Sequence, residues 1–136
     1  MKNGLGLRII TNNPLVVRCM SAYYTVEYYD ISFRQVLVKV RDMVYEGYEL
    51  HTHPIAGSVK PNETPYKSIV VSRDKKGFNM EHAQMCSDSI ITFDKFTPIV
   101  RQLPQRILDD FQLIDYTLLA GALDFDAAAG LSIANP

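Results

Sequence analysis

The residues best suited to chemistry lie between His51 and Ser68, in the segment HTHPIAGSVKPNETPYKS, which has neither helical nor strand periodicity. Long irregular connections are uncommon in compact domains and often carry function. Hydroxyl, amide and ammonium donors crowd this loop, and its two lysines outnumber its one acidic residue. Such donors suit a small carboxylate or phosphate, or an acidic partner protein; the alternative is a solvated or partly disordered connector. The candidate ligand-binding residues in the loop are His51, His53, Ser58, Lys60, Asn62, Thr64 and Lys67.

His51 and His53 form an H-x-H pair, whose side chains share a face if the pair lies on a strand. Two imidazoles are an incomplete ligand set, and only Asp30, Glu63 or His82 could extend it. We therefore expect no metal and no cofactor; the simpler interpretation is that one histidine caps a strand end while the other is exposed. The chain also lacks a G-x-S-x-G nucleophile elbow and a glycine-rich phosphate motif, so we predict no catalytic residue.

Asn12 and Asn13 form a second candidate group, in the turn Thr11–Pro14. Backbone N–H groups at a helix start attract anions, and the two amide side chains could orient a carboxylate or phosphate. The alternative is plain helix capping, with Asn13 as N-cap and Pro14 as the first helical residue. We include both asparagines among the expected ligand-binding residues.

Bulk composition limits the classes of function. The 136 residues predict one α/β domain over residues 1–124, followed by a loosely held tail over residues 125–136. A net charge of −1 without a basic run argues against nucleic-acid binding. No apolar run approaches the ~20 residues of a membrane span. Cys19 and Cys86 have neither metal-ligand nor redox spacing, which favours a reduced, cytoplasmic setting. The sequence leaves a homodimer open.

The pattern along the chain predicts strands at residues 7–11, 25–29, 48–52 and 68–72, and helices at residues 14–20, 33–46, 80–93 and 104–122. Residues 89–93 fit a strand as well as a helix. Ser32 and Gln35 have the spacing of a capping box. Alternating strands and helices predict a layered fold with a mostly parallel four-stranded sheet flanked by helices and one long binding-type loop. Ligands in such folds lie beyond the carboxyl ends of the strands, where this loop begins.

Three segments of this chain resemble the GrdX family: ITNNPLV at residues 10–16, YDISFRQVLVKVRDMVYEGYEL at residues 29–50, and HPIAGSVKPNETPYKSIVVS at residues 53–72. Proteins of that family are small and are encoded beside glycine reductase in anaerobic, amino-acid-fermenting bacteria. The resemblance implies a non-catalytic accessory protein of anaerobic amino-acid reduction, whose partner is a glycine reductase component or a small anionic metabolite. It brings no catalytic residues with it. The alternative is a small enzyme acting on an amino acid or acyl phosphate, with His51 or His53 as general base.

Overall fold

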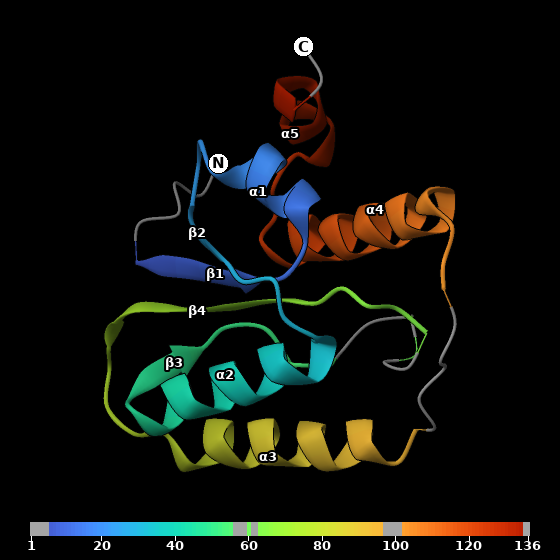
Figure 1. The fold of residues 1–136 in the computed structure, drawn as a ribbon. Coiled ribbons are helices and arrows are strands. Elements are labelled where there is room, and N and C mark those ends of the chain that lie inside the picture. Colours follow the sequence, from blue (N-terminus) through green and yellow to red (C-terminus); the bar gives the residue numbers. More distant parts are fainter. Residues whose placement is uncertain (1–5, 56–59, 61–62, 97–101, 135–136) are drawn as a thin grey trace.

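The computed structural model describes residues 6–55, 60, 63–96 and 102–134, and places a four-stranded sheet between two layers of helices (Figure 1). In chain order the elements are β1 (Leu7–Thr11), α1 (Pro14–Met20), β2 (Thr25–Tyr28), α2 (Phe33–Tyr45), β3 (Tyr48–Leu50), β4 (Ser68–Lys75), α3 (Met80–Asp94), α4 (Gln105–Ala122) and α5 (Ala127–Ala134). The segment 89–93 is therefore helical. None of the helices in the described ranges has the length and apolar character needed to cross a bilayer.

The sheet is mixed, and the prediction of a mostly parallel sheet is wrong. Its strand order is β2-β1-β4-β3; β1 pairs with β2 in parallel, whereas β4 runs antiparallel to both β1 and β3. A parallel neighbour requires a long crossover, usually a helix, whereas β3 and β4 are joined by the loop 51–67, which has no helix in its described part. The strands β1, β2 and β3 still point the same way. Their carboxyl ends therefore share one edge with the start of β4.

Both faces of the sheet are covered, which explains the continuously apolar sequence of β4. Ile9 and Val70 are register partners and pack with α1 and α4. Ile10 and Ile69 are the next partners and pack with α2 and α3 on the opposite side. In Figure 1, α2 and α3 lie below the sheet, and α1, α4 and α5 lie above it.

Helix α2 begins as its sequence predicts. The hydroxyl of Ser32 accepts from the backbone N–H of Gln35 at 3.1 Å, and the Gln35 side chain accepts from the Ser32 backbone N–H at 2.8 Å. Gly47 follows the helix with φ +110°, a left-handed conformation that glycine adopts without strain. The capping box fixes the first turn of α2 beside the edge of the sheet where β1, β2 and β3 end.

Helix α5 lies in the segment for which the sequence predicts a loose tail. Phe125, just before it, is buried and meets the edges of the Tyr23 and Tyr24 rings at centroid distances of 5.2 and 5.9 Å. The hydroxyl of Tyr116 donates to the backbone carbonyl of Ala127 at 2.7 Å. These contacts join α5 to the core around α1 and α4.

Candidate functional site

Two hollows open at the edge where β1, β2 and β3 end. One, the large pocket, has a volume of about 590 Å³; the other, the small cleft, has about 200 Å³. Thr64, Pro65 and Tyr66 line the pocket, while Lys67 and Ser68 line the cleft. The end of the long loop therefore separates the two hollows, and this is the position where α/β folds bind ligands.

The small cleft collects three of the predicted ligand-binding residues. His51 and His53 follow β3, Lys67 immediately precedes β4, and helix α4 closes the other side. The described residues that line it are His51, Thr52, His53, Lys67, Ser68, Asp115, Leu118, Leu119 and Ala122. Residues from three distant parts of the sequence thus meet around one opening.

Asp115 is the buried centre of this cleft. Its carboxylate accepts from the Ser68 backbone N–H at 3.1 Å, from the Ser68 hydroxyl at 2.7 Å and from the Asn13 amide at 3.0 Å. The Ser68 hydroxyl also lies 2.7 Å from that of Thr11. Burial raises the pKa of Asp115, and the hydrogen bonds and the nearby Lys67 oppose this rise. The network ties α4 to the ends of β1 and β4.

Lys67 is the cation of the cleft. Its side chain is partly buried, and this desolvation lowers its pKa even though the charge of Asp115 acts in the opposite direction. A lowered pKa means that the surroundings of the ammonium do not fully replace its hydration. An additional negative charge in the cleft would therefore stabilise the charged form of Lys67.

The two histidines are exposed and make local contacts. His51 Nε2 lies 3.1 Å from a Glu49 carboxylate oxygen, and His53 Nδ1 accepts from the Ile55 backbone N–H at 3.2 Å. His82 Nδ1 accepts from the backbone N–H of Leu50, the last residue of β3, at 3.2 Å. Among the described residues, no group of three or more His, Cys, Asp or Glu side chains is arranged to hold a metal ion.

Asn12, one of the two predicted asparagines, forms hydrogen bonds across the edge where β1, β2 and β3 end. The Asn12 amide donates to the carbonyls of Ile31 and Pro65 at 2.9 and 2.8 Å, and its oxygen accepts from the Lys67 N–H at 2.8 Å. Asn12 therefore links the loop end to the segment between β2 and α2. Because both amide hydrogens are donated to the protein, this side chain positions the walls of both hollows.

Asn13 is fully buried below Asn12. Its side-chain oxygen accepts from the Leu15 N–H at 3.0 Å, which is the predicted N-cap of α1. Its amide donates to the Gln112 carbonyl at 2.9 Å and to the Asp115 carboxylate. Asn13 thus orients the Asp115 carboxylate, and because Asn13 is fully buried, a ligand cannot contact it.

The other predicted ligand-binding residues of the loop do not meet in the small cleft. Thr64 lines the large pocket, and its hydroxyl accepts from the Tyr66 N–H at 3.2 Å. Lys60 is exposed and lines neither hollow. Ser58 and Asn62 lie outside the described residues. Of the loop candidates that the structure describes, those that line a hollow lie near the two ends of the loop.

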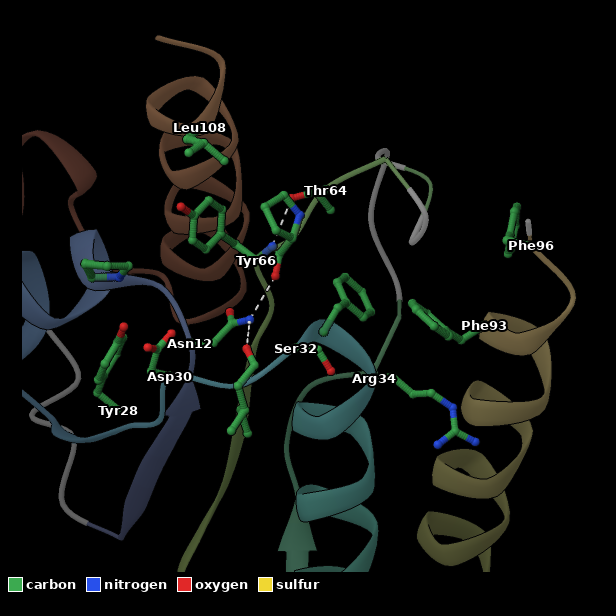
Figure 2. A pocket seen from close by; sticks show the side chains of 14 residues that line it. Asn12, Tyr28, Asp30, Ser32, Arg34, Thr64, Tyr66, Phe93, Phe96 and Leu108 are labelled. Carbon is green, nitrogen blue, oxygen red and sulfur yellow. Dashed lines mark hydrogen bonds between the residues drawn. The ribbon is translucent and has the colours of Figure 1, made fainter. Parts of the chain in front are cut away.

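The large pocket has mainly apolar walls, contributed by the start of α2, the end of α3 and the loop end (Figure 2). Its described lining consists of Asn12, Pro14, Tyr28, Asp30, Ile31, Ser32, Phe33, Arg34, Thr64, Pro65, Tyr66, Phe93, Phe96 and Leu108. Its volume lies within the ~300–1,000 Å³ typical of small-molecule sites. Most of these residues were not among the sequence candidates.

In the described lining of the two hollows, no hydroxyl is hydrogen-bonded to a histidine. The Ser68 hydroxyl is bonded to Thr11 and Asp115, not to a histidine. Both cysteines are free and buried; burial raises the pKa of Cys86 to about 11 and also raises that of Cys19, against the effect of Arg18.

Asp115 was missed because it lies in an apolar helical stripe. Ile114 and Leu118 have the helical spacing typical of inward-facing residues, but both are exposed, at 38% and 43%, while Gln112 and Asp115 are buried. A single carboxylate within the run LIDYTLL was the available signal, since a buried charge requires partners. The donors in Asn13 and Ser68 supply them.

The chain was compared with known families and proteins. The sequence model of a family described as GrdX-like protein matches residues 8–124, which is most of the chain. No curated protein and no solved structure matches it. The matched region includes both hollows and ends just after α4.

Proposed function

The chain belongs to the GrdX-like family, and from this membership and the geometry of the small cleft we propose that it is a non-catalytic accessory protein of the glycine reductase system. In this role it binds a small carboxylate or phosphate in the small cleft. The family supports the metabolic system, and the cleft supports the ligand class. The observation that carries the proposal is the partly buried ammonium of Lys67 beside His51 and His53.

Lys67 favours an anion for an electrostatic reason. Desolvation lowers its pKa although Asp115 lies near. The oxygens of Asp115 already accept three hydrogen bonds from Asn13 and Ser68. An incoming carboxylate or phosphate therefore meets a cation whose counter-charge is engaged elsewhere, and a charge-assisted hydrogen bond to such a group is strong.

The histidines add to this preference at the rim. Both are exposed beside Lys67, and because His53 Nδ1 accepts from the Ile55 N–H, its ring can donate to an anion from Nε2. The hydroxyl of Ser68, by contrast, is held by Thr11 and Asp115. The cleft thus offers donors for an anion, and its hydrogen bonds hold the Ser68 hydroxyl away from reaction, as a non-catalytic binding site requires.

The ligand class is tested by calorimetric titration of the purified protein with inorganic phosphate and with acetate. Lys67→Met removes the charge and keeps much of the side-chain volume, so we expect it to weaken binding of the preferred anion about tenfold or more. Lys76→Met is the matched control, because Lys76 is exposed and its backbone pairs with Gly47 at the opposite edge of the sheet. Equal affinity in Lys67→Met and wild type contradicts the anion site.

The system is tested separately, by affinity co-purification of the protein with purified glycine reductase components. We expect a complex with at least one component, stable in moderate salt. Absence of any complex contradicts the accessory role while leaving the anion cleft standing. Hydrolysis of an acyl phosphate by wild type but not by a His51→Gln variant would replace the proposal with the enzyme alternative.

A further inference from the structure

The large pocket contains one acidic and one basic residue in its described lining, and they differ in how they are paired. Arg34 donates to both carboxylate oxygens of Asp94, from Nε at 2.8 Å and from Nη2 at 2.9 Å. The carboxylate of Asp30 makes no hydrogen bond or ion pair with any described residue. The unpaired charge of the pocket is therefore negative.

The groups near Asp30 suit a cation. Figure 2 shows the side chains of Asp30 and Tyr28 at one end of the pocket, with Tyr66 on the neighbouring wall. A cation is attracted to the face of an aromatic ring as well as to a carboxylate. The Tyr66 hydroxyl accepts from the Gln112 amide at 2.9 Å, which fixes its position.

The opposite end of the pocket suits an apolar group. Phe33 and Phe93 stack with their ring centroids 5.3 Å apart and an interplanar angle of 20°. Figure 2 places Phe93 and Phe96 on the far side of the pocket from Asp30. Leu108 of α4 also lines the pocket, on the Tyr66 side in Figure 2. A ligand spanning the pocket would thus have one charged end and one apolar end.

The start of α2, in the described lining of the pocket, favours an anion, because helix N-termini carry positive partial charge. Its capping box already engages the Ser32 hydroxyl and backbone N–H with Gln35. The nearby Arg34 is held by Asp94. Asp30 is therefore the charged side chain of the described lining that has no partner of opposite charge.

We propose that the large pocket binds a small organic cation, a protonated amine carrying an aromatic or branched apolar body, with the ammonium at Asp30 and the body against Phe33 and Phe93. This site is separate from the anion cleft, so its failure and that of the proposed function are distinguishable. No covalent step is involved.

The proposal is tested with three probes that share one body: 2-phenylethylamine, 2-phenylethanol and 3-phenylpropionate. Their affinities are measured by protein-observed NMR titration. We expect the amine to bind most tightly and to shift the amide signals of residues that line the large pocket. Asp30→Asn should weaken the amine about tenfold and leave the alcohol nearly unchanged. Asp30 is exposed and unbonded, so this variant keeps the fold.

Asp74→Asn is the matched control, because Asp74 is an exposed carboxylate near the far end of β4. It should leave the affinity for the amine unchanged. Tighter binding of 3-phenylpropionate than of the amine, or equal amine affinity in Asp30→Asn and wild type, overturns the proposal. Binding of a lysine-containing peptide without binding of the amine would assign the pocket to a partner protein and overturn the small-molecule site.

Discussion

The large pocket and the small cleft share an edge and a wall, and each has one acidic and one basic residue in its described lining, histidines apart. In the pocket the arginine is engaged by Asp94, and the carboxylate of Asp30 is unpaired. In the cleft the carboxylate of Asp115 is saturated by hydrogen bonds, and Lys67 is the charge left incompletely solvated. We therefore expect opposite ligand preferences in spite of equal formal charge, because only the charge that the protein leaves unpaired is available to a ligand.

The largest expected effect concerns the saturated carboxylate of the cleft. Asp115→Ala leaves the donors of Asn13 and Ser68 buried without a partner, so we expect a loss of about 3 kcal/mol in the free energy of unfolding. Urea denaturation measures it. Asp110→Ala, on the exposed side of the same helix, should change stability by less than about 0.5 kcal/mol.

The same variant tests whether the two hollows are separate. Asp115 does not line the large pocket, so the affinity for 2-phenylethylamine should be retained under conditions where Asp115→Ala stays folded. An equal loss of amine binding would mean that the pocket and the cleft respond as one site.

The next effect comes from the residue that serves both hollows. Asn12→Ala removes hydrogen bonds to the carbonyls of Ile31 and Pro65 and from the Lys67 N–H, and we expect a loss of about 2 kcal/mol. It should also weaken the binding of both ligands, because the segment from Pro65 to Lys67 forms a wall shared by the two hollows. Thermal unfolding and the two ligand titrations measure these effects.

Asn79→Ala is the matched control for that variant. Asn79 caps α3 through one hydrogen bond to the His82 N–H and lines neither hollow. Its loss should cost about 1 kcal/mol of stability without changing either affinity. If Asn12→Ala behaves in the same way, Asn12 is a structural residue without influence on binding.

The acid titration should separate the two regions. Pairing with Arg34 lowers the pKa of Asp94 below 3.8, so its contribution to stability is present above pH 3.8 and is lost as pH falls through the lower folded value. Burial raises the pKa of Asp115 above 3.8, so its contribution is present below pH 3.8 and is lost as pH rises through the raised value.

Carboxyl ¹³C NMR measures both titrations directly. We expect the Asp94 signal to move at lower pH than a free aspartate and the Asp115 signal at higher pH. Asp115→Asn should remove the acid-side stabilisation from the pH profile of unfolding. An Asp115 carboxyl that titrates below pH 3.8 would show that its hydrogen bonds outweigh its burial.

The elements of this fold could be predicted where the chain has a clear local signal. The Ser32–Gln35 capping box and the Asn13–Pro14 start gave the first residues of α2 and α1, and both are confirmed. The pairing of β4 could not be read from its apolar run, because burial on both faces occurs in mixed sheets as well as in parallel ones. The connection between β3 and β4 was the better signal.

The candidate site was predictable in position and less so in composition. The loop's end residues do lie at the carboxyl edge, because strand direction places them there. The aromatic wall of the large pocket comes from Phe33 at the start of α2, Phe93 at the end of α3, and Phe96, which follows α3. Their meeting depends on how α2 packs against α3, and helical periodicity does not specify that arrangement.

The smallest expected effect comes from breaking the ion pair between Arg34 and Asp94 at the large pocket. Asp94→Asn removes the counter-charge of Arg34 while keeping the size of the side chain, and thus gives the large pocket an available cation. The affinity for 3-phenylpropionate should rise and that for 2-phenylethylamine should fall, both by smaller factors than Asp30→Asn produces. The factors are small because both partners are about half exposed and water screens the released charge. Asp88→Asn, a change to an exposed carboxylate bonded to Gln84 on the same helix, should alter neither affinity. An unchanged order and ratio of the two affinities in Asp94→Asn would contradict this expectation. In that case the pairing of Arg34 does not determine whether the pocket prefers a cation or an anion, and the contrast with the cleft must be attributed to Asp30 alone.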